Sequence, residues 1–209
     1  MIVRLRKGLL VVTPEAEAAG ELAAWLETHA GQVFRLRGIA GGSAVFTAIG
    51  PEPEACRIPL NITSKVAAPL NLISNFSRSP FTLDGKDYAS VEGFWQGLKF
   101  PDEADRRRLA GLFGAKPKDE GFGAPAADTL VYEGQTIRVG TWDHWQLMER
   151  ACAAKFEQNG AARRALLSTG TRPLEHRMRR DSRTIPGAIM AEIWMRLRDR
   201  LAKMAASEA

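Results

Sequence analysis

A proline- and glutamate-rich segment, Pro-Glu-Pro-Glu at residues 51–54, constrains the fold of this 209-residue chain more than any other feature. Proline fixes φ and removes a backbone donor, so such a run neither continues a helix nor fits a central strand. The residue types typical of a functional site appear only after Ile58. We therefore expect a small extension over residues 1–57 and a separate domain over residues 58–209.

The extension is predicted to be a strand–helix–strand–strand unit without candidate chemistry. Thr13 and Pro14 are typical of a helix start, with threonine as N-cap and proline at the first helical position. A Gly-Gly pair at residues 41–42 predicts a turn between two strands. The elements are expected at residues 2–12 (one or two strands), 13–29, 32–37 and 43–49.

Composition excludes several classes of protein. With 45% hydrophobic and 25% charged residues, the chain resembles an average globular protein and not a disordered or coiled-coil one. Its apolar runs are shorter than the roughly 18–20 residues of a membrane span, and we expect a cytoplasmic protein. Cys56 and Cys152 form no CxxC pair, and the three histidines show no metal-binding spacing. We expect no metal and no cofactor.

Basic charge is concentrated toward the C-terminus. Residues 1–60 carry six basic and six acidic side chains, whereas the last fifty residues carry eleven and five. Five arginines lie within residues 172–183, including Arg177 and Arg180. Such a cluster attracts phosphate on a nucleotide or on nucleic acid, and arginine is suited to grip it. The alternative is a solvated basic surface.

The larger domain is predicted to be mostly helical. A tight turn at Asp84–Gly85 follows a strand, Ser90 is expected to cap a helix, and residues 111–136 read as a long irregular segment of the kind that is often functional. Three further helices are expected: one carrying Trp145, Met148, Cys152 and Phe156, one over residues 161–167, and one from about Pro186 with Ile193, Leu197, Leu201 and Met204 on its inner face.

The helix at residues 91–100 has a polar row beside an apolar stripe. Glu92, Gln96 and Lys99 share one face because they are spaced i, i+4 and i+7. A surface helix with a Glu–Lys pair would show the same spacing. Aromatic neighbours favour partial burial of the row, and buried charges need partners or a function.

Several segments in one order resemble the NADAR superfamily, also termed YbiA-like. They are Leu-Ile-Ser-Asn-Phe at 72–76, Ser-Pro-Phe at 79–81, Leu-Asp-Gly-Lys at 83–86, Glu-Gly-Phe-Trp-Gln-Gly-Leu-Lys-Phe at 92–100, Ala-Lys-Phe-Glu-Gln at 154–158, Ala-Leu-Leu-Ser-Thr at 165–169, Leu-Glu-His at 174–176 and Met-Arg-Leu-Arg-Asp-Arg-Leu at 195–201. The resemblance covers about residues 70–202. It implies a compact, mostly helical α+β domain.

The resemblance further implies an N-glycosidase, which cleaves the bond between a ribose carbon and a base nitrogen. Its substrates would be phosphoribosylated intermediates of riboflavin synthesis or ADP-ribose attached to guanine in nucleic acid. The family motifs imply a catalytic role for Glu92, Lys99 and Asp181, and substrate binding by the residues Asn75, Phe76, Gln96, Lys155 and Glu175.

Chemistry suggests roles for individual groups. Glu92 can stabilise an oxocarbenium-like state or act as general base. Lys99 can bind phosphate or, if desolvated, attack the sugar carbon to form an imine. Trp142, in a loop-like stretch, is the preferred base-stacking candidate over Trp95, which favours core packing, and over Phe76. His144 is expected to be a capping or surface histidine.

The chain departs from the family pattern at four places: a family arginine has no clear match near residues 115–118, the Gly- and Asn-containing loop before the last helix is missing, and two further differences concern residues 93 and 181–187. Gly93 replaces a histidine after the helix glutamate, and residues 181–187 lack the family tryptophan. A non-catalytic module that binds nucleic acid or ADP-ribose through residues 172–183 therefore remains an alternative. Another alternative is a phage or host structural protein that uses the fold as a scaffold, with residues 1–55 as its assembly surface.

Overall fold

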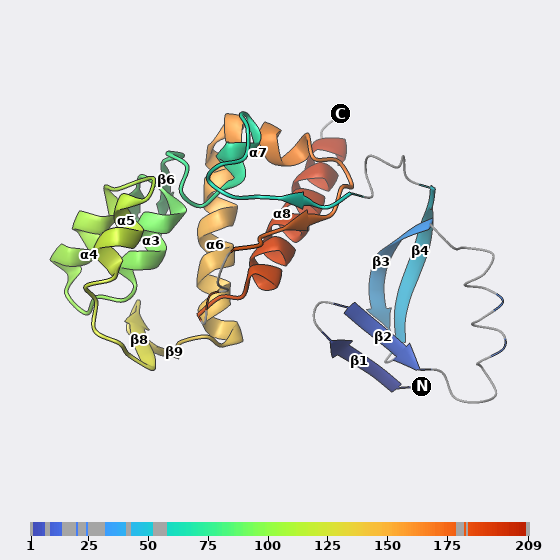
Figure 1. Ribbon diagram of the computed structural model, residues 1–209, viewed down its shortest axis with the longest axis horizontal. Coiled ribbons are helices and arrows are strands. Elements are labelled where there is room, and N and C mark those ends of the chain that lie inside the picture. The colour runs from blue at the N-terminus through green and yellow to red at the C-terminus, as the bar shows by residue number, and fades with distance from the viewer. Residues whose placement is uncertain are drawn as a thin grey trace. The chain divides into compact units, whose positions relative to one another are not determined.

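The structure is a computed structural model that describes residues 2–6, 9–13, 20, 24, 32–40, 43–51, 58–178, 182 and 184–207. The chain divides into two compact units, Met1–Ile58 and Pro59–Ala209. Helices and strands both occur, and helices dominate the larger unit (Figure 1). The predicted α+β class is confirmed.

The smaller unit contains two antiparallel strand pairs. β1 (Ile2–Arg6) pairs with β2 (Leu9–Thr13), and β3 (Gln32–Ala40) pairs with β4 (Ser43–Pro51). These pairs confirm the predicted strands, although β3 is three residues longer than expected. Of the helix predicted over residues 13–29, the described part consists of Gly20 and Ala24, both helical.

The larger unit consists of helices with short strand pairs between them. In chain order its elements are β5 (Leu60–Asn61), η1 (Leu70–Ile73), β6 (Phe81–Leu83), β7 (Lys86–Tyr88), α3 (Val91–Gly97), α4 (Glu103–Ala110), α5 (Lys116–Gly121), β8 (Thr129–Tyr132), β9 (Gln135–Arg138), α6 (Trp142–Gln158), α7 (Gly160–Leu167), β10 (Leu174–Glu175) and α8 (Gly187–Ser207). β5 and β10 are parallel, and the β6–β7 and β8–β9 pairs are antiparallel.

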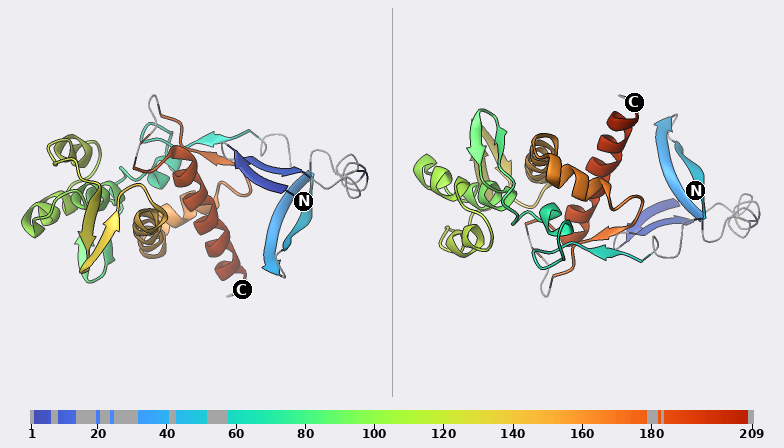
Figure 2. Two further views of the ribbon diagram at one scale, coloured as in Figure 1. Left: turned by 90° about the horizontal axis from the view of Figure 1, so that it is seen from below. Right: turned by 90° about the horizontal axis from the view of Figure 1, so that it is seen from above.

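The helices form two groups around one core. α6, α7 and α8 pack against one another, and α3 contacts α4, α5 and α6 (Figures 1 and 2). The buried residues Met148, Cys152 and Phe156 of α6 confirm the predicted inner face of that helix. On α8 the predicted face is buried except at Met204, which is 47% exposed because the last turn of the helix extends past the core.

Local sequence explains where α3 and the first hairpin begin. Ser90 caps α3, since its Oγ accepts a hydrogen bond from the Gly93 N–H at 2.9 Å, as predicted. Asp84 and Gly85 have φ values of 51° and 73°, which a two-residue hairpin turn requires. The structure confirms both predicted signals.

The segment at residues 111–136 is more regular than predicted. It contains α5 and most of the β8–β9 hairpin, whose strands are four residues each. Leu130 and Tyr132 are buried and alternate with exposed residues, so the strand period is present but short. In the described part of the chain, no helix combines the length and the apolar character of a membrane span.

Candidate active site

Two members of the polar row, Glu92 and Gln96, are buried on α3 and bonded to each other, whereas Lys99 lies beyond the helix and is exposed. Glu92 is 6% exposed, and its Oε1 accepts a hydrogen bond from Gln96 Nε2 at 2.8 Å. The other amide atom, Gln96 Oε1, is buried without a hydrogen-bond partner among the described residues. Lys99 follows the end of the helix, and its Nζ donates to the Gly121 carbonyl at 3.4 Å. The spacing correctly predicted that Glu92 and Gln96 share one face, but the helix ends at Gly97, three residues earlier than expected, so Lys99 lies in the turn that follows it.

α5 covers this row at close range. A Cβ atom at Gly121, the last residue of α5, would collide with Gln96 Oε1, so the backbone approaches the amide where only glycine fits. Lys118, on the same helix, adds a positive charge that acts on both Glu92 and Lys99. Glu92 and Gln96 are therefore buried next to α5, and the exposed Lys99 continues the row toward solvent.

Burial moves the protonation of the two charged groups in opposite directions. Desolvation raises the pKa of Glu92, and the Gln96 hydrogen bond and the charges of Lys118 and Lys99 oppose this rise. Desolvation also lowers the pKa of Lys99, against the opposite effect of Glu92. The two shifts bring the pKa values of the acid and the base closer together.

A pocket of about 630 Å³ opens beside the row. Lys99 and Gly121 line it, so the pocket adjoins the polar face of α3. Its lining is mainly apolar and includes Trp95, Leu98, Phe100, Phe122, Leu130 and Val139. Two further polar side chains, Arg106 and His144, also line it. A concave apolar pocket with a few convergent polar groups is the usual form of a small-molecule site.

His144 is part of the pocket wall and not a surface residue as predicted. It is 4% exposed, and its ring stacks on Trp95 with centroids 4.2 Å apart and planes at 19°. The Gly140 N–H donates to His144 Nδ1 at 3.1 Å, and burial lowers the pKa of the imidazole to about 4. The ring is thus neutral near pH 7, with its proton on Nε2.

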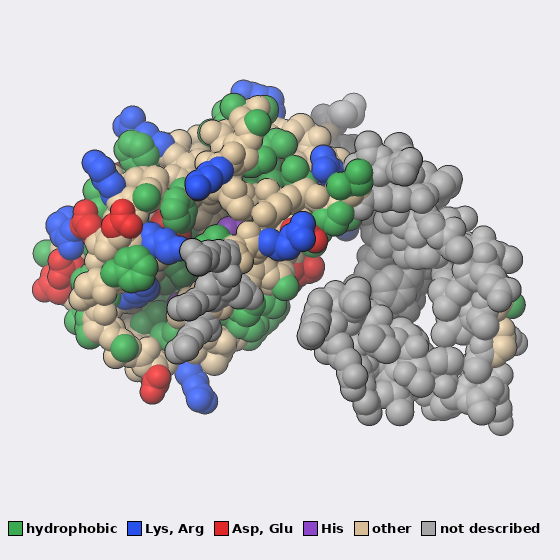
Figure 3. All heavy atoms as spheres, in the orientation of Figure 1, with side chains coloured by type: hydrophobic (Ala, Val, Ile, Leu, Met, Phe, Trp, Pro, Cys, Tyr) green, Lys and Arg blue, Asp and Glu red, His purple; other side chains and the backbone are tan. Residues whose placement is uncertain are grey.

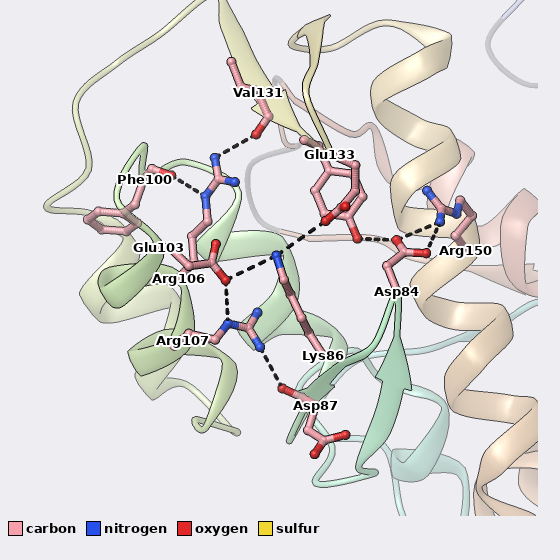
Figure 4. Close-up of polar contacts among 11 residues, drawn as sticks. Asp84, Lys86, Asp87, Phe100, Glu103, Arg106, Arg107, Val131, Glu133 and Arg150 are labelled. Carbon is pink, nitrogen blue, oxygen red and sulfur yellow. Dashed lines mark hydrogen bonds and ion pairs between the residues drawn. The ribbon is translucent and has the colours of Figure 1, made fainter.

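Arg106 fastens two sides of the pocket together. Its Nε donates to the Phe100 carbonyl at 2.6 Å, and its Nη2 donates to the Val131 carbonyl at 2.8 Å (Figure 4). Both acceptors belong to pocket-lining residues. The guanidinium therefore holds the segment after α3 against β8.

A second set of polar contacts fixes the β8–β9 hairpin. Asp84 accepts hydrogen bonds from the Tyr132 hydroxyl at 2.6 Å and from Arg150 Nη2 at 2.6 and 2.7 Å. Lys86 pairs with Glu133 at 3.4 Å, from the neighbouring turn (Figure 4). These contacts join β6–β7, β8–β9 and α6 at the edge of the pocket wall.

The loop at residues 73–77 supports the start of α3. The Asn75 carbonyl accepts the Glu92 N–H at 3.0 Å, which places the two predicted site residues together. The Asn75 side chain, however, contacts the sulfur atoms of Met190 at 3.2 Å and Met148 at 3.6 Å. The half-buried Phe76 accepts the Gly114 N–H through its carbonyl.

Lys155 holds the same loop from beneath. Its ammonium is fully buried and donates to the Ile73 carbonyl at 3.1 Å, the Ser74 carbonyl at 2.8 Å and Ser77 Oγ at 3.0 Å. Burial lowers the pKa of Lys155 to about 7, while three acceptors favour its protonated form. The structure places Lys155 as an anchor of the loop that carries Asn75 and Phe76.

The remaining predicted residues are not brought to the pocket. Trp142 begins α6 instead of lying in a loop, and it is 57% exposed, with the Arg196 guanidinium over its ring at 5.8 Å. Glu175 in β10 forms an ion pair with Arg177 at 2.7 Å. Neither Trp142 nor Glu175 is among the pocket-lining residues.

Asp181, Arg179, Arg180 and Arg183 lie outside the described residues, so most of the predicted basic cluster is not placed. On the face drawn in Figure 3, the Lys and Arg side chains of the larger unit are dispersed and do not gather into one patch. Among the residues that the structure describes, no three His, Cys, Asp or Glu side chains gather as a metal site would require.

Close packing against the end of α4 explains why residue 93 is a glycine. A Cβ atom at this position would lie 2.6 Å from the Leu109 carbonyl oxygen and 3.0 Å from that of Leu112. The end of α4 therefore occupies the space where the family resemblance implies a histidine side chain. This departure from the family pattern belongs to the contact between α3 and α4.

Sequence reasoning missed three pocket residues, Arg106, Phe122 and His144. Phe122 carried a signal that could have been used, because it is a large aromatic residue within a stretch of glycine, alanine and proline. Arg106 and His144 gave no such signal, since Arg106 is placed by its contacts with the Phe100 and Val131 carbonyls and His144 by its stack on Trp95.

Known proteins resemble this chain in sequence and in structure. The family described as bacteriophage protein GP30.3 matches residues 68–197. A 17.1 kDa protein from the Gp30–rIII intergenic region of Enterobacteria phage T4 is 32% identical over 120 residues, which cover 56% of this chain and 79% of the phage protein.

The Escherichia coli protein YbiA, solved by NMR, has a similar structure. The likeness has a TM-score of 0.54 at 22% identity and covers 73% of this chain and 92% of YbiA. At this identity the likeness shows the fold alone. It confirms the predicted YbiA-like fold.

Proposed function

The chain belongs to the bacteriophage GP30.3 protein family, and on this premise we propose that it is an N-glycosidase. Its substrate would be a phosphoribosylated or ADP-ribosylated nucleobase, whose ribose–base bond it hydrolyses. One observation carries the proposal: a buried carboxyl group, Glu92, is held by Gln96 and interacts electrostatically with Lys99, which lines a 630 Å³ pocket. A buried carboxyl group with a shifted pKa and a charged neighbour at a pocket is characteristic of a functional site.

Glu92 is proposed to act as general base and as the stabilising negative charge. In hydrolysis, a water oxygen bonds to the ribose carbon while the carbon–nitrogen bond breaks and its electron pair goes to the base. The water proton passes to Glu92, and the base nitrogen takes up a proton. A raised pKa makes the Glu92 carboxylate a stronger base for this step. Its charge stabilises the oxocarbenium-like state.

Lys99 supports two routes that an experiment separates. As an ammonium it can bind a phosphate of the substrate. As a free amine, favoured by its lowered pKa, it can bond to the ribose carbon while the bond to the base breaks and the base takes up a proton. The bond from that carbon to the ring oxygen then breaks as the oxygen takes the second amine proton, and the resulting imine is hydrolysed by water. The side chain of Gln96 holds the Glu92 carboxylate through its amide N–H and is proposed to act through that group.

The other predicted residues have proposed supporting roles. Asn75, Phe76 and Lys155 would act through the loop that holds the start of α3. Substrate contacts by Trp142, Glu175, Arg177 and Arg180, and catalysis by Asp181, remain predictions of the sequence.

Release of free base tests the proposed activity. The full chain would be incubated with ribosylated bases, NAD, ADP-ribosyl-guanosine and ADP-ribosylated DNA, and the products analysed by mass spectrometry. We expect a free base from at least one substrate. If no substrate is cleaved while binding to unmodified DNA or RNA weakens steeply with salt, the chain is the alternative binding module.

Borohydride trapping tests the imine route. If Lys99 attacks the sugar, reduction during turnover should leave a covalent sugar adduct on the wild type and none on Lys99→Ala. If Lys99 only binds phosphate, no adduct should form and Lys99→Arg should keep most of the activity. An adduct that persists in Lys99→Ala would exclude Lys99 as the nucleophile.

A further inference from the structure

We infer that the 630 Å³ pocket beside α3 is the subsite for the nucleobase, in which Phe122 stacks on the base and His144 donates a hydrogen bond to it. The inference deepens the proposed function and rests on it for the identity of the substrate. It assigns roles to two side chains that sequence patterns did not single out.

The size and walls of the pocket suit a planar ring. Its volume lies within the roughly 300–1,000 Å³ of small-molecule sites and is large enough for a nucleotide. Trp95 and His144 stack on each other and form a rigid aromatic wall. Three alanines, at residues 124, 126 and 127, also line the pocket and take up little of its space.

Phe122 is placed to stack on a ligand. It lines the pocket, yet 77% of its surface is exposed, the most among the large apolar side chains of the described residues that are noted as exposed. It directly follows Gly121, whose carbonyl is held by Lys99, so its backbone is fixed next to the polar row. An aromatic ring at a pocket edge contributes stacking to any base, because every base presents a π face.

His144 supplies one hydrogen-bond donor, and the structure indicates which ring nitrogen carries the proton. His144 Nδ1 accepts a hydrogen bond from the Gly140 N–H, so the neutral ring carries its proton on Nε2. Nε2 makes no hydrogen bond to any residue that the structure describes. A single N–H in an apolar wall selects a ligand that offers an acceptor there, such as a carbonyl oxygen or a ring nitrogen of a base.

The charges of the pocket favour a phosphorylated ligand over a neutral apolar one. Lys99 and Arg106 both line the pocket, and none of the described lining residues is acidic. Two cations at one pocket, without a carboxylate, attract a phosphate group. The occupant is therefore a base joined to a sugar phosphate.

Calorimetric binding to three probes tests this inference on the full chain. UMP and GMP carry a base, whereas ribose 5-phosphate has the same sugar phosphate without one. We expect both nucleotides to bind at least about 10-fold more tightly than ribose 5-phosphate, because stacking adds to the phosphate contact.

Variants test whether Phe122 and His144 contact the base. Phe122→Ala should weaken nucleotide binding about 10-fold and leave ribose 5-phosphate unchanged, and Phe122→Trp should restore it. Phe113→Ala is the matched control, because Phe113 is also exposed but does not line the pocket. His144→Phe keeps the stack on Trp95 and removes the donor, so it should reduce the ratio of nucleotide to ribose 5-phosphate affinity. A folding defect would weaken both probes and leave that ratio unchanged.

Two outcomes overturn the inference: equal affinity for nucleotides and ribose 5-phosphate, or the same effect of Phe122→Ala and Phe113→Ala. Analysis of the same samples for released base separates the two proposals. Base-dependent binding without any base release from the activity panel supports the subsite and contradicts the glycosidase. Base release without an effect of Phe122→Ala supports the glycosidase and contradicts the subsite.

Discussion

Desolvation sets the protonation states of the groups around the pocket. Burial favours the neutral form of Glu92, Lys99 and His144 alike, raising the pKa of the acid and lowering those of the bases. The carboxyl and the amine also interact electrostatically with each other, whereas the shift of the histidine pKa comes from burial. Burial is thus the main cause of all three pKa shifts, including the one that keeps His144 neutral.

The neutral state of His144 makes stability depend on pH. Its folded pKa of about 4 is below the ordinary 6.5, so the unfolded chain binds a proton first as the pH falls. Stability from this group is therefore present above pH 6.5 and is lost as the pH falls toward 4. We expect urea unfolding of the wild type to lose about 2 kcal/mol more between pH 7 and pH 5 than that of His144→Gln, which cannot titrate.

Both proteins keep His29 and His176, so the difference between them isolates His144. An NMR titration measures the pKa of His144 directly, and we expect the ring to be half protonated near pH 4. A midpoint near pH 6.5, or parallel stability curves for the two proteins, would contradict the buried neutral ring.

Residue-level prediction succeeded where the signal was local. The i, i+4 spacing of Glu92 and Gln96 predicted the contact that the structure shows at 2.8 Å. It failed for His144, whose burial depends on Trp95, 49 positions earlier in the chain, and on the hairpin that precedes α6. Sequence spacing within one helix does not reveal what another helix places on top of it.

At the scale of elements, α3 presents two glycines to α4, and the space available for a side chain differs between them. Gly93 faces the Leu109 and Leu112 carbonyl oxygens, which are backbone atoms that cannot rotate away. Gly97, one turn later, would place a Cβ at an ordinary 3.5 Å from the Arg106 carbonyl. The close packing of the helices therefore requires glycine only at the first position.

This difference gives a matched pair of variants. Gly93→Ala should lower the free energy of unfolding by about 1–3 kcal/mol, because the end of α4 must move away. Gly97→Ala should be neutral or raise it by up to about 1 kcal/mol, because alanine is the better helix former. Urea denaturation of both variants measures the effect. Equal changes would show that α4 does not constrain α3 at Gly93.

Element prediction from sequence followed the strength of local signals. The Asp84–Gly85 turn and the Ser90 cap were found because each has a specific backbone requirement. The β8–β9 hairpin was missed because its strands have only four residues each and lie within a segment rich in glycine and proline. Its position is fixed by tertiary contacts, such as the Asp84–Tyr132 hydrogen bond.

At the scale of the whole molecule, the family and fold likenesses concern the larger unit. The family match begins at residue 68, and all the proposed site residues lie in the unit Pro59–Ala209. We predict that residues 58–209 fold without the extension. The shortened chain should be monodisperse and unfold cooperatively in urea, with base release equal to that of the full chain. An insoluble or non-cooperative product would show that residues 1–57 complete its core.

The rate of base release by Glu92→Gln tests the central claim most directly. The substitution keeps the shape of the side chain and removes its charge, so we expect kcat to fall about 10²–10³-fold. Glu192→Gln, on the exposed face of α8, is the control and should retain wild-type turnover. Comparable turnover by Glu92→Gln and wild type, on a substrate that the wild type cleaves, would contradict the account and direct attention to Glu175 or Asp181.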